Sequence, residues 1–336
     1  MSTLQDVADR AGVAPITVSR VINNSGYVSD ATRLRVERAI AELEYVPNVL
    51  ARSLRSRQTN TLALVLTDIT NPFWTTVARG VEDAASEAGF NVIFCNTDES
   101  EKAQEQYLYM LLQKQVDGVL LVPARSKPDS VLFIQKQNTP LVVLDRRVPG
   151  AQVNGVRCDS KDGAYRLMRL LLSLGHRRIA MLSGPKDVST AADRVAGYRR
   201  ALTEAGLEVE ELLVLYGEFT QASGYEMARR AMVLLPRPTA LFAANNFIAT
   251  GAIRALRKMN LHVPDDVALV SFDDFPPSLL IDPFLTVANQ PAYEMGQRAT
   301  ELLLAHLDDQ HSRACQEIIL PTEIIVRRSS GEKIED

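Results

Sequence analysis

The sequence predicts an α/β protein in which an all-α helix-turn-helix headpiece precedes two lobes, each built on a doubly wound parallel sheet. Three observations predict this fold. The first sixty residues carry only helical patterns of apolar residues. From Thr61 onward, short apolar strands alternate with helices. This alternation restarts near Asp159, which divides the second part of the chain into two βα arrays.

Two short helices joined by a tight turn are expected first. Residues 4–11 have helical apolar spacing, and Thr3 can cap them. Gly12 permits a sharp turn, and Pro15 suits the first turn of a second helix. The outward face of that helix carries Ile16, Thr17, Ser19, Arg20 and Asn23. This arrangement indicates a helix-turn-helix, although an ordinary helical corner with a solvated face has the same spacing.

A third helix is expected from Ala31 to about Glu44, capped by Ser29, with Leu34, Ala39, Ile40 and Leu43 facing inward. Residues 48–57 can then form one or two helical turns. This basic segment is too short to be a stable helix alone in water, so we expect it to order on a partner.

Residues 3–57 carry four motifs without a gap, namely TLQDVADRAGV, TVSRVIN, VSxxTRxxVxxAIxELxYxPN and ARSL. This segment resembles the headpiece of the LacI/GalR family of transcription repressors. The resemblance implies that the second helix lies in the major groove of double-stranded operator DNA. It also implies that residues 48–57 fold on DNA as a hinge helix, where Leu54 enters the minor groove and Ala51 packs beside it.

The resemblance assigns two kinds of DNA contact within the headpiece. Phosphate contacts, which fix register rather than sequence, are expected from Thr17, Ser19, Asn23, Ser29, Thr32, Tyr45 and Asn48. Pro15 and Ile16 stand where the family helps to choose its operator, and they offer a base only apolar contacts. Arg20 is the candidate for a bidentate contact to guanine. Ala14 departs from the usual Ser, which removes one hydroxyl.

The charge of the chain is unevenly distributed. Residues 1–58 hold eight arginines and six acidic residues, a net charge of +2. The overall net charge is −4, so the rest of the chain carries −6. This asymmetry suits a DNA-binding headpiece on an acidic body. The sequence shows no signal-peptide pattern and no apolar run of the ~20 residues that span a membrane, which predicts a cytoplasmic, nucleoid-associated protein. Cys95, Cys158 and Cys315 follow no metal or disulfide spacing and are expected to be buried, reduced thiols.

The body is expected to contain two arrays of strands and helices. The first array has strands at 62–66, 92–95, 118–122 and 141–144, with helices at 73–88, 101–115 and 129–137. The second has strands at 179–182, 212–215, 240–243 and 267–271, with helices at 162–174, 191–205, 220–234 and 247–259. A last helix at 292–307 and apolar runs at 318–320 and 324–326 complete it.

Residues 61–328 resemble the periplasmic sugar-binding-protein fold that the same family carries, with NPF at 71–73, LGHRRIA at 174–180 and Phe-Asp-Asp at 272–274. The expected domains are a headpiece at 1–58 and an effector-binding and dimerisation domain at 59–336. Its N-lobe covers about 61–160 and 291–319, and its C-lobe about 161–290 and 320–328. No heptad repeat follows Arg328, so a homodimer on a pseudo-palindromic operator is expected.

Polar and aromatic residues follow the expected strands at the edge where open α/β sheets bind ligands. Each matches a position that contacts sugar in the ribose-binding branch of the fold: Asn71, Phe73, Trp74, Asp145, Arg146, Arg194, Phe219, Asn245, Asp273 and Gln290. Planar polar groups bond paired hydroxyls, and rings cover C–H faces. A small-molecule effector, a sugar or sugar derivative, is therefore expected between the lobes.

Other roles remain open for single residues. Asn71 or Asp273 can simply cap a helix, Trp74 can belong to the core or a dimer interface, and Asp145 can form a rim ion pair with Arg146. Asn246 stands where the family usually has Asp. A purine or a protein co-repressor is an alternative effector. No catalytic constellation, metal cluster or phosphate-binding loop is found, which argues against an enzyme fused to a DNA-binding headpiece and against any cofactor or metal.

Overall fold

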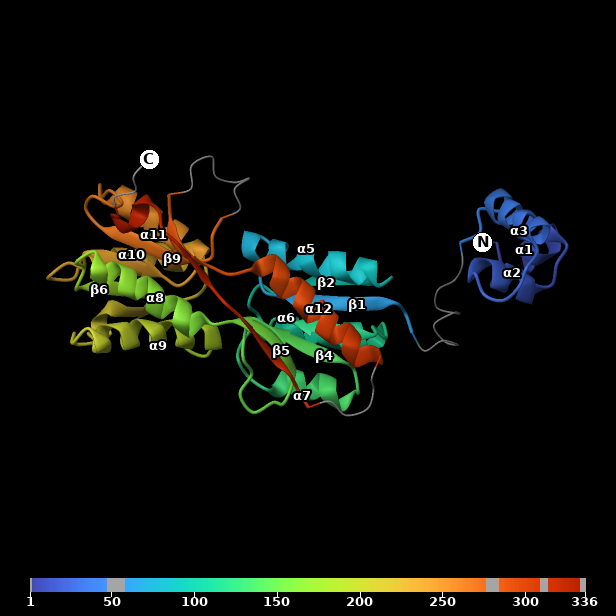
Figure 1. The fold of residues 1–336 in the computed structure, drawn as a ribbon, viewed down its shortest axis with the longest axis horizontal. Helices are drawn as coiled ribbons and strands as arrows, with labels where there is room; N and C mark the ends of the chain where they lie inside the picture. Colours follow the sequence, from blue (N-terminus) through green and yellow to red (C-terminus); the bar gives the residue numbers. More distant parts are fainter. Residues whose placement is uncertain (1, 47–57, 276–283, 309–313, 333–336) are drawn as a thin grey trace. The chain divides into compact units, whose positions relative to one another are not determined.

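The computed structural model describes residues 2–46, 58–275, 284–308 and 314–332 (Figure 1). By its internal contacts the chain forms two compact units, Met1–Thr59 and Asn60–Asp336. We call the first unit the headpiece and the second the body, and each is described by itself. The hinge residues Asn48, Ala51 and Leu54 lie outside the described residues.

The headpiece packs three helices, α1 (Leu4–Ala11), α2 (Pro15–Ile22) and α3 (Asp30–Glu42), around one small core. Thr3 and Asp6 form a reciprocal capping box at the start of α1, as their spacing predicts. Gly12 has a left-handed φ of 64°, which lets the chain turn sharply into α2. Val18 and Val21 are buried against α1 and α3, so the opposite side of α2 is left for contacts outside the headpiece.

The inward orientation expected for Leu34 is wrong, because its side chain is 69% exposed. The buried residues of α3 are Val36 and Ala39, and the half-buried Ile40 and Leu43 continue the same stripe. Leu34 precedes Val36 by two positions, which places it about 200° away around the helix. The buried stripe of α3 therefore begins at Val36 and not at Leu34.

In the body, the N-lobe contains a six-stranded sheet of order β11-β5-β4-β3-β1-β2, all of whose neighbours are parallel. Its strands are β1 (Thr61–Leu66), β2 (Asn91–Asn96), β3 (Gly118–Leu121), β4 (Leu141–Leu144), β5 (Asn154–Cys158) and β11 (Glu317–Leu320). Leu62, Leu64 and Leu66 face a core with helices α5 (Pro72–Glu87) and α12 (Ala292–Asp308). The alternate residues Ala63 and Val65 face α6 (Glu101–Gln113) and α7 (Asp129–Lys136).

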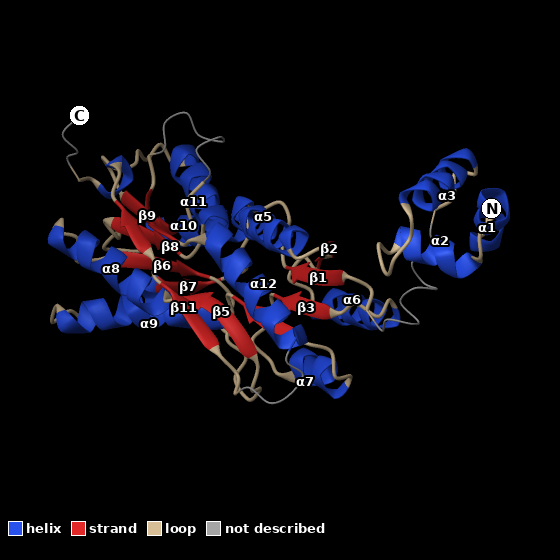
Figure 2. Ribbon diagram, turned by 45° about the vertical axis from the view of Figure 1, so that its right-hand side comes forward, coloured by secondary structure: helices blue, strands red, loops and turns tan. Residues whose placement is uncertain are grey.

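The C-lobe repeats this plan with the strand order β12-β10-β9-β8-β6-β7. Figure 2 shows β9, β8 and β6 of this sheet side by side. Its strands are β6 (Ile179–Ser183), β7 (Val214–Tyr216), β8 (Ala240–Ala243), β9 (Ala268–Phe272), β10 (Thr286–Asn289) and β12 (Glu323–Ile325). Helices cover both faces: α8 (Ser160–Ser173) pairs with α9 (Ser189–Glu204), and α10 (Gln221–Met232) pairs with α11 (Asn246–Lys258). Short 3-10 turns at Glu211–Leu213 and Arg328–Ser330 complete the lobe.

Helix α12 follows the C-lobe in sequence but packs beside α5 in the N-lobe (Figure 1). Two glycines make this contact possible. A Cβ added at Gly80 would lie 2.1 Å from the Tyr293 carbonyl oxygen, and one added at Gly296 would lie 2.2 Å from that of Val77. The close backbone approach fixes α12 to the N-lobe, so the chain must cross between the lobes on either side of it.

Three expectations about the body need correction. Strands β5 and β10 were not expected, because Asn, Gly and Arg interrupt the first, and polar Thr and Asn leave the second with only two apolar residues. Strand β12 runs antiparallel to β10, so the C-lobe sheet is not wholly parallel. Cys315 is exposed, whereas Cys95 and Cys158 are buried, and burial raises the pKa of the Cys95 thiol to about 11. Among the described residues, no helix is long and apolar enough to cross a membrane.

Candidate functional site

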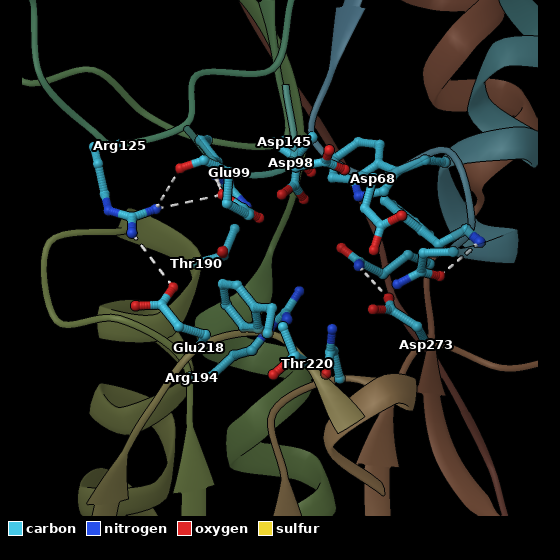
Figure 3. Close-up of a pocket in the computed structure, with 18 residues that line it drawn as sticks. Asp68, Asp98, Glu99, Arg125, Asp145, Thr190, Arg194, Glu218, Thr220 and Asp273 are labelled. Carbon is cyan, nitrogen blue, oxygen red and sulfur yellow. Dashed lines mark hydrogen bonds and ion pairs between the residues drawn. The ribbon is translucent and has the colours of Figure 1, made fainter. Parts of the chain in front are cut away.

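A cavity of about 400 Å³ lies between the two lobes of the body, at the carboxyl ends of the strands (Figure 3). The structure brings all ten residues predicted for effector binding into its lining: Asn71, Phe73, Trp74, Asp145, Arg146, Arg194, Phe219, Asn245, Asp273 and Gln290. They come from both lobes, although the sequence separates the first from the last by more than two hundred positions. The cavity is therefore a site that only the folded body creates.

Aromatic rings line the cavity from both lobes. Phe73 and Trp74, at the start of α5, meet edge to face with their ring centroids 4.8 Å apart. Phe219 comes from the C-lobe, and the Arg146 guanidinium lies 5.8 Å from its ring centroid. Gly184 makes room for Phe219, since an added Cβ would come 2.3 Å from the ring. The rings offer apolar surfaces within an otherwise polar cavity.

Two buried carboxylates, Asp145 and Asp273, come from opposite lobes (Figure 3). Each directly follows a strand, β4 or β9, and each has a left-handed φ, 61° and 62° respectively. Burial raises the pKa of both carboxyl groups, that of Asp273 to about 6. Gln290 donates a hydrogen bond of 2.5 Å to Asp273. Asp273 therefore bonds to another lining side chain. It caps no described helix, so the helix-capping alternative does not hold for it.

The positive charge of Arg194 acts on both acids, because it opposes the rise in the pKa of Asp145 and of Asp273. The side chain comes from α9 and is buried. It donates a 2.6 Å hydrogen bond to the Ala244 carbonyl, and its guanidinium stacks 4.1 Å from the centroid of the Phe272 ring. These contacts fix the guanidinium while its Nε keeps no hydrogen-bond partner among the described residues.

Buried polar atoms without partners mark where a polar ligand would bond. Among the described residues, the lining contributes five such atoms: Thr67 Oγ1, Asp145 Oδ1, Arg146 Nε, Arg194 Nε and Gln290 Oε1. Two are donors, two are acceptors, and the Thr67 hydroxyl can be either. Leaving a buried polar group unpaired costs free energy, so such groups in native proteins normally have a partner. The arrangement can therefore accept a ligand that both donates and accepts hydrogen bonds.

The rim ion pair considered for Asp145 and Arg146 is not the contact that forms. The Arg146 guanidinium instead makes two bonds to the Glu99 carboxylate, at 2.6 and 2.7 Å. It also donates to the carbonyls of Pro123 and Ala124. Arg146 is thus held by loops of its own lobe, and its terminal nitrogens are already occupied.

Asn71 both caps α5 and joins the lobes. Its side-chain oxygen accepts from the Phe73 amide at 3.0 Å, as the capping alternative requires. Its amide group also exchanges two hydrogen bonds with the Asn246 amide, at 3.0 and 2.9 Å. Asn245 caps α11 through the Ile248 amide. Asn246, the residue that departs from the family's Asp, therefore takes part in a neutral bond between the lobes.

Several charged lining residues were not predicted from the sequence: Asp68, Asp98, Glu99, Arg125 and Glu218, together with Thr67, Thr190 and Thr220. All of them follow a strand or begin a helix. The same strand-end reasoning, applied to β2, β3 and β7, would have found most of them. Among the described residues, no group of three or more His, Cys, Asp or Glu side chains is placed to hold a metal ion.

The headpiece residues predicted for DNA contact lie mainly on the exposed side of α2 and at the start of α3. Ile16 is 56% exposed, and Pro15, Arg20 and Asn23 are exposed as well. Asn23 bonds back to the Ser19 carbonyl and hydroxyl. Thr17 and Ser19 are half-buried, and the Ser29 hydroxyl caps α3 by accepting from the Thr32 amide while it donates to the Thr32 hydroxyl. Tyr45 differs from the rest because its ring packs against the headpiece core.

Both parts of the chain match models of known families. Residues 59–323 match the model of periplasmic binding proteins and the sugar-binding domain of the LacI family. Residues 3–48 match the model of bacterial regulatory proteins of the lacI family. The chain belongs to the LacI family. It is accordingly a helix-turn-helix transcription repressor with a periplasmic-binding-protein-like body, as the resemblance of its motifs predicted.

Relatives span the whole chain. The HTH-type transcriptional regulator DegA of Bacillus subtilis is 38% identical, over 98% of this chain and 98% of its own length. The ribose operon repressor of Escherichia coli K12 is 36% identical, over 98% of this chain and 100% of its own. Among solved structures, the Lac repressor dimer bound to operator and the anti-inducer ONPF has a TM-score of 0.85 at 28% identity, covering 98% of this chain and 99% of that chain.

Proposed function

We propose that this LacI-family repressor changes its operator affinity when an uncharged sugar binds in the cavity between its lobes. The observation that carries this proposal is that Asp145 and Asp273, from opposite lobes, line one cavity together with Arg194. Carboxylate and guanidinium groups make paired, charge-assisted hydrogen bonds to neighbouring hydroxyls. Phe73, Trp74 and Phe219 supply the apolar surfaces that cover the C–H faces of a sugar ring.

The charge of the lining favours an effector without an acidic group. The described lining residues include six carboxylates and three arginines. Arg146 is paired with Glu99, and Arg125 lies within 3.5 Å of three carboxylates. A phosphate or sugar acid would bring further negative charge to a cavity whose six carboxylates already outnumber its three arginines, of which only Arg194 forms no ion pair with a carboxylate among the described residues. A polyol brings hydroxyl donors to the carboxylates instead.

The same features argue against a purine. A flat base is best held by rings that stack on its two faces. Phe73 and Trp74 instead meet at an interplanar angle of 72°, so they do not form parallel walls. The lining also holds six carboxylates, which are more than the N–H groups on the edge of a neutral purine could pair with. A sugar therefore accounts for more of the lining than a purine does.

We assign DNA binding to the headpiece and sensing to the body. In this proposal Arg20 contacts a guanine, Pro15 and Ile16 make apolar base contacts, and the remaining predicted residues of the headpiece contact phosphates. Two subunits of a homodimer read the two halves of the operator. The effector acts only through its different affinity for two arrangements of the lobes, typically worth ~1–3 kcal/mol. The bound sugar is released unchanged, because the protein is a regulator and not an enzyme.

The deciding experiment is isothermal titration of the full chain with neutral pentoses and hexoses, their phosphates, and hypoxanthine and guanine. Operator binding is then measured with and without each ligand that binds. We expect a neutral sugar to bind, to change operator affinity, and to be recovered chemically intact. Tighter binding of a phosphorylated sugar or a purine than of every neutral sugar would refute the effector class. Consumption of the sugar would refute the regulatory role of the cavity.

A further inference from the structure

Arg125 joins the two lobes at one side of the cavity. It belongs to the loop after β3 in the N-lobe, and its side chain is 18% exposed. From there it reaches two C-lobe carboxylates, Glu218 at 3.3 Å and Asp187 at 3.5 Å. Figure 3 shows the guanidinium extending from the upper side of the cavity toward Glu218 on the lower side. Within its own lobe it contacts the Glu99 carboxylate at 3.5 Å and the Ala124 carbonyl at 2.9 Å.

Three backbone amides form hydrogen bonds between the lobes beside Arg125. The Ser126 amide donates to the Asp187 carbonyl at 3.1 Å. The Ser189 amide donates to the Ser126 hydroxyl, and the Arg147 amide donates to the Ser189 hydroxyl, both at 2.8 Å. Each of these bonds has its donor in one lobe and its acceptor in the other. They exist only while the lobes are together, so they report directly on whether the cavity is closed.

The charges around Arg125 explain why this single side chain matters. One cation is surrounded by three carboxylates, of which Glu99 is in the N-lobe and Asp187 and Glu218 are in the C-lobe. With the cation present, attraction acts across the boundary between the lobes. Glu99 is also held by Arg146 at 2.6 and 2.7 Å, so it stays paired without Arg125. The substitution of Arg125 therefore removes the attraction that Asp187 and Glu218 exert across the boundary between the lobes.

We propose that Arg125 is a positioning residue that holds the lobes closed over the cavity through Asp187 and Glu218. Effector specificity belongs to the buried lining, whereas Arg125 sets how often the cavity opens and thereby how long a ligand stays. This inference goes beyond the identity of the effector. Its test uses the ligand-free protein, so its failure and the failure of the proposed function can be told apart.

The test is hydrogen exchange of the full chain without ligand, read at the amides of Ser126, Arg147 and Ser189. When reclosing is faster than exchange, the exchange rate of such an amide is proportional to the fraction of time that it is open. Glu218→Gln removes one acceptor charge and lies far in sequence from all three amides. We expect this variant to exchange roughly two- to fivefold faster at all three, the range for one partly exposed ion pair. We expect the exchange rates of these amides to rise further in Arg125→Met than in Glu218→Gln.

Arg157→Met is the matched control. Arg157 has 17% of its side chain exposed and pairs with Glu317, but both residues belong to the N-lobe. Its substitution should leave the three amides at the wild-type rate. Raising the salt concentration from 0.1 to 1 M, where the screening length falls to about 3 Å, should speed exchange more in the wild type than in Arg125→Met, in which the Arg147–Asp193 ion pair still joins the lobes.

Two results would overturn the proposal. The first is wild-type exchange at the three amides in both Arg125→Met and Glu218→Gln. The second is an equal acceleration in Arg157→Met, which would mean that loss of any arginine pair loosens the body. Amides inside β1, whose bonds stay within one lobe, serve as the internal reference for correct folding.

Discussion

Asp273→Asn is expected to stabilise the ligand-free protein near neutral pH. The carboxyl group is buried, and desolvation raises its pKa from 3.8 to about 6. An acid whose pKa is higher in the folded state binds its proton more tightly there, so folding stability falls as the pH rises from the unfolded pKa through the folded pKa. A shift of roughly two units corresponds to about 3 kcal/mol lost by pH 7. Asparagine has no charge to desolvate and recovers part of this loss.

The contacts of Asp273 support the choice of asparagine. Gln290 donates to one side-chain oxygen of Asp273, and the amide oxygen of asparagine can accept the same bond. Asp145, Asp273 and Arg194 together carry one excess negative charge when both acids are ionised, so the substitution leaves the cluster neutral. The gain is therefore not cancelled by an unpaired Arg194.

Urea denaturation of both proteins at about pH 5 and pH 7.5 measures the effect. The variant should have the higher free energy of unfolding, and its advantage over the wild type should be ~1.4 kcal/mol larger at pH 7.5 than at pH 5. The reason is that the wild type loses stability over this pH range as the Asp273 carboxyl group ionises in the unfolded state before it does in the folded state. Isothermal titration should show that the variant no longer binds the effector. A variant that is less stable than the wild type at pH 7.5, or whose advantage is the same at both pH values, would refute the reasoning.

Three further predictions concern the headpiece, the hinge and the N-lobe. Arg20→Ala should reduce discrimination at one operator position by ~1–3 kcal/mol; an unchanged binding preference across a library of operators would contradict the guanine contact. Leu54→Ala, by the family resemblance, should weaken operator binding in a gel-shift assay without changing effector affinity, and equal loss of both would exclude a hinge role. Gly296→Ala should lower the free energy of unfolding by about 1–3 kcal/mol, because its Cβ would meet the Val77 carbonyl at 2.2 Å; unchanged urea denaturation would show that α5 and α12 can separate freely.

The fold was largely predictable because each lobe repeats strong local signals. Continuous apolar runs such as 62–66 identify strands that are buried on both faces, and these were found. Strand β5 escaped because its residues alternate between buried and half-buried and include a glycine. Strand β10 escaped because its two apolar residues stand between the polar Thr286 and Asn289, unlike the wholly apolar four-residue strands β4 and β8. The position of α12 was inferred from the family resemblance, since a local pattern does not tell which lobe a helix joins.

The site was predictable only in part, for a related reason. Residues at the ends of strands can be found from the strands themselves, and this placed Asp145, Asn245 and Asp273. Glu99, Arg125 and Glu218 lie in loops whose partners belong to other loops or to the opposite lobe. The strand ends could have marked these three residues as lining candidates, but which loops meet depends on how the lobes close, so their pairing is not encoded in a local pattern. The pairing of Arg146 with Glu99 was not predicted for the same reason, because Glu99 lies 47 residues away in the sequence.

The common strand order of the lobes explains why the cavity can couple ligand binding to movement. Strand β4 holds the same place in the N-lobe sheet that β9 holds in the C-lobe sheet. Each is followed directly by an aspartate with a left-handed backbone, Asp145 in one lobe and Asp273 in the other. Aspartate tolerates this conformation better than most residues, and it turns both carboxylates toward the boundary between the lobes.

A ligand that bonds to both aspartates therefore contacts both lobes at once. Its affinity must depend on the distance between the lobes, whereas a ligand held by one lobe alone would bind equally well to open and closed forms and would shift nothing. Among the described residues, Asp145 Oδ1 and Gln290 Oε1, the latter on the side chain that bonds Asp273, are buried without a hydrogen-bond partner. The hydroxyls of a bound sugar would satisfy them only in the closed form. In the proposed function, the two aspartates would therefore supply the differential affinity that regulation of the operator requires.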